Sequence, residues 1–135
     1  MKRAARLGDA YFPYLFSPER YRESLAKVRA FAEAAGRDPS TIQGAIYQFI
    51  ALADTHDEAR QRANQELSLR YNQPFDRIVE RYCVLGTPDQ CADRLNQYVE
   101  AGTRHFILVP ICPPAELPAH LEAYARQIAP KVRSR

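Results

Sequence analysis

The stretch Gly86-Thr-Pro-Asp-Gln-Cys-Ala-Asp-Arg-Leu-Asn-Gln-Tyr-Val-Glu-Ala-Gly-Thr-Arg-His-Phe-Ile-Leu-Val-Pro110 decides the expected fold. Thr87 can cap a helix with its hydroxyl, Pro88 suits the first helical position, and Gln90 has the spacing of a capping box. Apolar residues then recur at helical spacing as far as Gly102, a residue type that commonly ends a helix in the left-handed conformation. We therefore predict a helix between residues 87 and 102.

An unbroken apolar run follows at residues 106–109 and is bounded by Pro110. Such a run predicts a strand buried on both faces, as in a parallel sheet. The other expected elements are a basic helix ended by Gly8, an aromatic strand running into a loop at 10–16, a helix from the Ser17 cap to Gly36, a strand at 42–53, helices at 56–69 and 75–82, and a terminal helix ended by Pro130.

This order alternates helices with three mostly apolar strands. Alternation of this kind favours an α/β fold in which right-handed crossovers place the helices outside a parallel sheet. Three strands are few for such a sheet, because its two edges stay unpaired and its core is half covered. We therefore expect a partner to cover part of it, most simply a second copy in a homodimer.

The composition is that of one folded domain covering residues 1–135, with 46% hydrophobic residues and a net charge of +3. The basic residues are spread along the chain, so we expect no nucleic-acid partner. No apolar run approaches the roughly 20 residues of a membrane span, and the first residues lack the apolar core of a secretion signal. We expect no membrane partner and a cytoplasmic location.

Three cysteines, Cys83, Cys91 and Cys112, are odd in number and form no Cys-x-x-Cys pair. This favours reduced, buried thiols over disulfides or zinc ligands. The three histidines are far apart and lack metal-ligand spacing. No metal site is expected.

Four blocks, in one order and spacing, resemble the C-terminal half of the luciferase-like monooxygenases. They are Arg3-Ala-Ala-Arg-Leu-Gly-Asp-Ala-Tyr-Phe-Pro13, Ser17-Pro18 with Ala34-Ala-Gly-Arg-Asp-Pro39, Ala51-Leu-Ala-Asp54, and Gly86-Thr-Pro-Asp89 with Gly102-Thr-Arg-His-Phe-Ile-Leu108. That family comprises oxidoreductases that use a flavin or deazaflavin and are built on a TIM barrel. One position departs mildly, since Ala10 stands where the family commonly has Gly.

The resemblance implies a half TIM barrel in which residues 10–14, 43–53 and 105–109 form the last three of eight parallel strands. It also implies FMN or the deazaflavin F420 as cofactor, and a small-molecule substrate. A complete barrel takes roughly 200 residues or more. We therefore expect an incomplete cofactor site, because the chain is a fragment of a longer enzyme or is completed by another chain.

In such barrels the chemistry gathers at the C-terminal ends of the strands. The candidate cofactor-binding residues at those ends are Phe12, Pro13, Tyr14, Asp54 and Pro110, with Ile111 and Cys112 beside them. Aromatic rings there suit a flat isoalloxazine or an apolar substrate. The alternatives are that the rings only pack the core and edge, and that Asp54 caps the following helix.

No catalytic residue can be assigned from the sequence. His105 stands at the start of its strand, away from the end where chemistry is expected, and His120 lies in what the pattern predicts to be a surface helix. Cys112 has no activating His or acid nearby in sequence.

Two functions remain open. One is a flavin-dependent oxidoreductase, or its C-terminal portion, that needs the other half of the barrel. The other is a non-catalytic half-barrel that dimerises through its exposed sheet edges.

Overall fold

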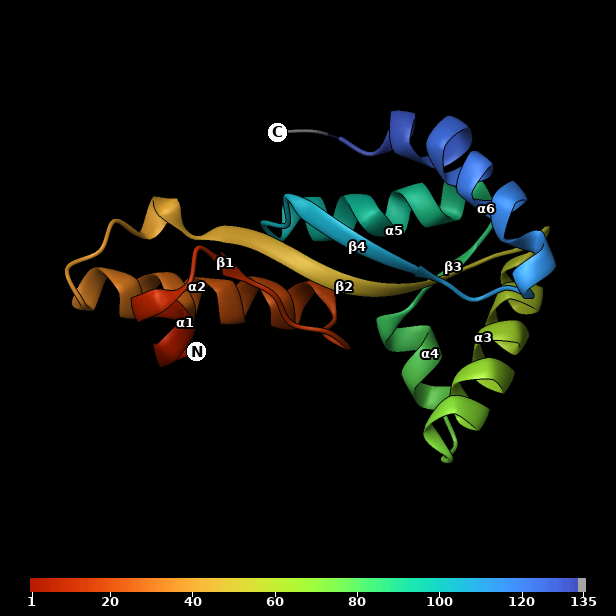
Figure 1. Cartoon of the computed structure of the whole chain (residues 1–135), viewed down its shortest axis with the longest axis horizontal. Coiled ribbons are helices and arrows are strands. Elements are labelled where there is room, and N and C mark those ends of the chain that lie inside the picture. The colour runs from red at the N-terminus through yellow and green to blue at the C-terminus, as the bar shows by residue number, and fades with distance from the viewer. Residues whose placement is uncertain (134–135) are drawn as a thin grey trace.

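The computed structural model describes residues 1–133 as a parallel sheet with helices packed against it (Figure 1). The elements are α1 (Lys2–Leu7), β1 (Ala10–Tyr11), α2 (Pro18–Ala34), β2 (Gln43–Leu52), α3 (His56–Tyr71), α4 (Asp76–Tyr82), β3 (Val84–Gly86), α5 (Pro88–Glu100), β4 (His105–Pro110) and α6 (Leu117–Ala123). A π-helical turn at Tyr124–Ile128 and a 3₁₀ turn at Ala129–Lys131 continue α6, so the predicted terminal helix ends close to Pro130.

Strand β2 is the centre of the sheet, and every pairing with it is parallel. Tyr47 pairs with Tyr14 and with Ile107, whereas Ile50 pairs with Val84 and with Pro110. A strand residue has only two edges, so β1 and β3 share one edge of β2 and β4 occupies the other. The prediction of a parallel α/β sheet is confirmed.

The structure adds a short fourth strand, β3, to the three strands that the sequence predicts. It spans only Val84–Gly86, which is too short to show a period in the sequence. It pairs with the C-terminal part of the same edge of β2 whose N-terminal part pairs with β1. The strand predicted at 10–14 is regular only over β1, with a single further bridge at Tyr14.

The local signals around α5 and α2 form as predicted. At α5 the Thr87 hydroxyl accepts from Gln90 N–H while the Gln90 side chain accepts from Thr87 N–H, a complete capping box. Gly102 follows the helix with φ +109. At α2 the Ser17 hydroxyl accepts from Arg20 N–H at 3.3 Å. These hydrogen bonds satisfy donors that a helix leaves free at its N-terminus.

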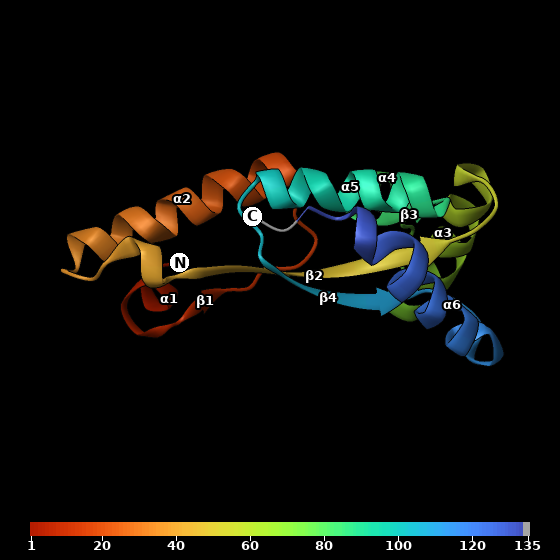
Figure 2. The same ribbon diagram turned by 90° about the horizontal axis from the view of Figure 1, so that it is seen from above.

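The two faces of β2 are covered by different helices. Ile42, Ile46 and Ile50 are fully buried and face α2 and α5, which lie along one side of the sheet in Figure 2. Phe49 and Ala51 point to the opposite face, where α3 and α4 cover only the C-terminal part of the sheet. We call this second, partly covered face the open face.

The prediction that the apolar run at residues 106–109, now part of β4, is buried on both faces is wrong. The first four residues of β4 alternate between exposed and half-buried, and Ile107 is 51% exposed. Within residues 1–133 no strand pairs with its outer edge, and α3 and α4 do not reach this part of the open face. An apolar run is buried on both faces only when neighbours cover both, and here one neighbour is missing.

Among residues 1–133, no helix is both long and apolar enough to cross a membrane.

Candidate functional site

Four aromatic rings on the open face line a hollow of about 290 Å³. They belong to Phe12, Tyr14, Tyr47 and Tyr71, and we call them the aromatic wall. Phe12 and Tyr14 each meet Tyr47 edge to face, with ring centroids 6.4 and 6.3 Å apart. These separations are typical of favourable aromatic pairs.

Backbone pairing and helix packing position the wall. Tyr47 N–H donates to Pro13 O at 3.1 Å, which holds the β1 loop beside β2. Tyr71 is the last residue of α3 and stacks on Phe75 at 5.0 Å after a left-handed turn at Asn72. Phe12, Tyr14 and Tyr71 remain 47%, 54% and 40% exposed. The wall therefore presents broad apolar rings to solvent.

The structure brings together only some of the predicted site residues. Phe12 and Tyr14 lie in the wall, with Pro13 between them in the same loop. Pro110 is half-buried and pairs on the other edge of β2, outside the hollow. Asp54 is exposed and does not cap α3, because the Thr55 hydroxyl accepts the capping hydrogen bond from Glu58 N–H. The capping alternative for Asp54 is thus wrong.

Sequence reasoning missed Tyr47 and Tyr71. Tyr47 carries a usable signal, because it alternates with the buried residues Ile46 and Gln48 within one strand and so must face the other way. Tyr71 carries none, because its place depends on how α3 folds back over the sheet.

None of the three histidines lines the aromatic wall's hollow. His105 is exposed at the start of β4, as predicted. His120 is only 8% exposed, which corrects the predicted surface position: its Nε2 lies 3.4 Å from Glu116 Oε2, and Tyr124 covers its ring. Glu116 also pairs with Arg62 at 3.3 Å, which ties the α6 segment to α3. Residues 1–133 contain no His, Cys, Asp and Glu cluster suited to a metal ion.

All three cysteines are free. Burial raises the pKa of both the Cys83 and Cys91 thiols to about 12. Cys112 is half-buried in the loop after β4, and desolvation, followed by the nearby Glu116 carboxylate, raises its pKa as well. A raised pKa makes the thiolate scarcer and so works against a nucleophilic role.

We expect one slow-reacting thiol in the native protein. Only the thiolate is nucleophilic, and a raised pKa keeps it scarce near pH 8. A thiol-specific disulfide reagent should modify Cys112 slowly, and faster as pH rises, whereas Cys83 and Cys91 should react only after denaturation. Counting thiols with and without urea, with Cys112→Ser as control, tests this. Rapid reaction of three native thiols would contradict the burial.

The parallel sheet and its outer helices define part of a β/α barrel. The model of the luciferase-like monooxygenase family matches residues 1–105. The chain belongs to this family, as the sequence resemblance predicts.

Individual proteins also resemble this chain, in sequence or in structure. The chain is 35% identical over 68 residues to a phthiodiolone/phenolphthiodiolone dimycocerosates ketoreductase from Mycobacterium sp. (strain JLS), a match covering 50% of this chain and 18% of that protein. An F420-dependent secondary alcohol dehydrogenase in complex with an F420-acetone adduct superposes with a TM-score of 0.83 at 19% identity, over 98% of this chain and 46% of its own. The oxygenating constituent of 3,6-diketocamphane monooxygenase from Pseudomonas putida, solved with FMN, gives 0.66 at 17% identity, over 98% and 45%.

The chain therefore spans less than half of the solved proteins it resembles, and the matched segment is a smaller share still of the ketoreductase. Its fold is that of a partial TIM barrel. The first of these two solved structures holds an F420-acetone adduct, and the second holds FMN.

Proposed function

We propose that this chain supplies one wall of the cofactor site in a flavin- or deazaflavin-dependent oxidoreductase. The observation that carries the proposal is the aromatic wall, which lies exposed on the open face of a sheet from a family of such enzymes. An isoalloxazine is a flat, largely apolar ring system. The wall offers it apolar contact and edge-to-face geometry.

The chain's own part in the chemistry is binding and orientation. The cofactor, when bound, supplies the redox chemistry. Phe12, Tyr14, Tyr47 and Tyr71 hold one side of the ring and exclude water from it. Pro13 fixes the loop that carries two of them, since its carbonyl binds the backbone of β2. Asp54 and Pro110, at the C-terminal ends of β2 and β4, remain proposed contacts for other parts of the cofactor or for the small-molecule substrate.

Activity requires further strands beside this sheet. The outer edge of β4 has no strand partner within residues 1–133, and Ile107 lies exposed next to it. The remainder of a barrel, from the same polypeptide or another, would pair with that edge and close the open face over the cofactor. We propose that the complete enzyme works in the cytoplasm.

A second function is supported by the same free edge. A non-catalytic half-barrel would hide β4 and the open face by pairing with a second copy, because unpaired edges bind other strands readily. In this case the protein is a dimer and the aromatic wall is part of the interface.

One sample separates the two functions. FMN and F420 are titrated into the purified protein while cofactor fluorescence and light scattering are recorded. If the aromatic wall binds the cofactor, the cofactor fluorescence is quenched. Tyr14→Ala should then weaken the affinity for the cofactor about two- to tenfold. Phe31→Ala on α2 is the matched control, because Phe31 is also exposed. No quenching by either cofactor contradicts the first function, and a strictly monomeric species contradicts the second.

A further inference from the structure

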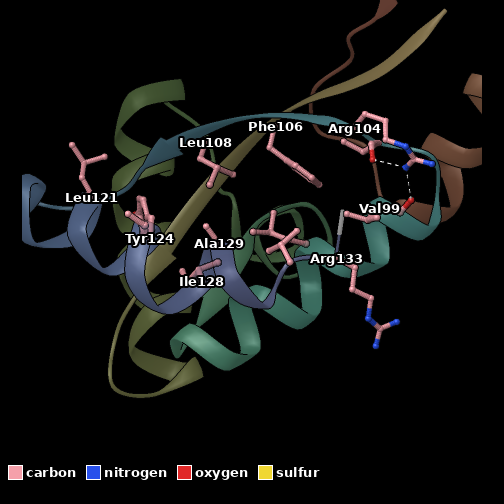
Figure 3. A pocket seen from close by; sticks show the side chains of 13 residues that line it. Val99, Arg104, Phe106, Leu108, Leu121, Tyr124, Ile128, Ala129 and Arg133 are labelled. Atoms are coloured by element: carbon pink, nitrogen blue, oxygen red, sulfur yellow. Dashed lines mark hydrogen bonds between the residues drawn. The ribbon is translucent and has the colours of Figure 1, made fainter. Parts of the chain in front are cut away.

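A larger apolar groove lies on the other side of the sheet from the aromatic wall. It runs between β4, α5 and the segment that continues α6, with a volume of about 610 Å³ (Figure 3). We call it the terminal groove. Its lining residues are Leu95, Val99, Thr103, Arg104, Phe106, Leu108, Leu121, Tyr124, Ala125, Ile128, Ala129, Val132 and Arg133.

The groove and the open face are separate because a strand points successive side chains to opposite faces. Phe106 and Leu108 line the terminal groove, whereas Ile107 between them lies on the open face beside Tyr47. A ligand in the groove therefore does not occupy the proposed cofactor site.

Charge is confined to one end of the groove. Figure 3 shows Arg104 and Arg133 at one end and Leu121 at the other. The lining residues include these two cations and no carboxylate. Arg133 is already paired with Glu100 at 3.3 Å, whereas Arg104 has no ion pair within residues 1–133.

The Arg104 guanidinium keeps donors to spare. Its Nη1 donates to Thr103 O at 2.9 Å and to Val99 O at 3.3 Å, which fixes the side chain at the end of α5. A guanidinium has five N–H donors, so Nη2 and Nε remain available. Such a fork suits a carboxylate, which it binds through two parallel hydrogen bonds.

We propose that the terminal groove binds a free, unbranched fatty acid, with its carboxylate at Arg104 and its alkyl chain along Phe106 and Leu108 toward Leu121. The groove volume lies within the roughly 300–1,000 Å³ usual for small-molecule sites. A neutral alkyl chain would gain nothing from the cationic end. A helix from a partner protein, about 10 Å across with its side chains, needs a wider channel than a single alkyl chain does.

The test is calorimetric titration of the whole chain with dodecanoate, below its micellar range, and with dodecan-1-ol as the neutral probe. Dodecanoate should bind more tightly than the alcohol. Arg104→Ala should weaken dodecanoate about tenfold or more, because it removes a charge-assisted hydrogen-bond pair, and leave the alcohol unchanged. Arg126→Ala is the matched control, since this exposed arginine on the same terminal segment lies outside the groove.

Two further measurements distinguish a loss of ligand binding from a loss of folding. Within the unmodified protein, affinity should rise about fourfold per methylene from decanoate to dodecanoate. Ala125→Trp, which fills the groove from its exposed rim, should weaken both probes while the thermal midpoint is kept. Equal binding of acid and alcohol, indifference to Arg104→Ala, or the absence of dodecanoate binding would each overturn the proposal. Because FMN and F420 titrations report on the opposite face, failure here is distinguishable from failure of the proposed function.

Discussion

Gly44→Ala is expected to destabilise the protein by about 3 kcal/mol or more. Gly44 lies in β2 where the turn after α5 crosses it, and Arg104 N–H donates to Gly44 O at 2.8 Å. A Cβ at this position would overlap the carbonyl of Gly102 and stand 2.7 Å from the Tyr21 hydroxyl. The obstacle is backbone, so relief requires moving a strand or the turn. Urea unfolding followed by circular dichroism measures the loss.

Gly36→Ala provides the contrasting control. Gly36 has φ +75 after α2, and a Cβ there meets no atom within 4 Å. Its cost is only that of a left-handed backbone for alanine, about 1 kcal/mol. If the Gly44→Ala variant is as stable as Gly36→Ala, the Gly102 carbonyl does not restrict the space beside Gly44.

Phe75→Ala is expected to cost about 3–5 kcal/mol, the usual price of emptying a buried phenylalanine site. Phe75 is 1% exposed, stacks on Tyr71 and packs among Leu67 and Val79 where α3 and α4 cover the open face. Its loss loosens the helical pair that holds Tyr71 in the aromatic wall. Chemical denaturation measures the stability, and the cofactor titration under conditions where the variant is folded measures the effect on the wall.

Leu69→Ala is the matched control for Phe75→Ala. Leu69 lies on α3, two residues from Tyr71, but is 74% exposed. Its truncation should change stability by less than about 0.5 kcal/mol. If both variants lose stability equally, the packing between α3 and α4 does not distinguish the two positions.

Features set by neighbours in sequence could be predicted. The capping box of α5 and the buried stripe of α2, including Tyr21, Leu25, Val28 and Ala32, are local patterns of hydrogen bonding and apolar spacing. The end of α2 is less well predicted, because the helix expected to run to Gly36 ends at Ala34. Local rules therefore predict the body of an element better than its end.

Features that depend on distant parts of the chain could not be predicted from the sequence. The apolar run of β4 resembles a strand covered on both sides, but its exposure depends on which segments lie beside it in space. His120 is buried because Glu116 and Tyr124 enclose it, which no helical period reveals. For the candidate site, the sequence predicts Phe12 and Tyr14 from their place after a strand. Tyr71 joins them only through the packing of α3 and α4.

The central place of β2 also governs the order of assembly. Ala10 pairs with Gln43, but Ala45 pairs with His105, so the edge formed by β4 is contributed by a segment near the far end of the chain. Closing so long a loop is entropically costly, and a growing chain cannot do it until β4 has emerged from the ribosome. While the residues between Leu52 and His105 are being made, the long, apolar middle strand therefore has one edge without its partner, and an unpaired edge of this kind is open to strands from other chains.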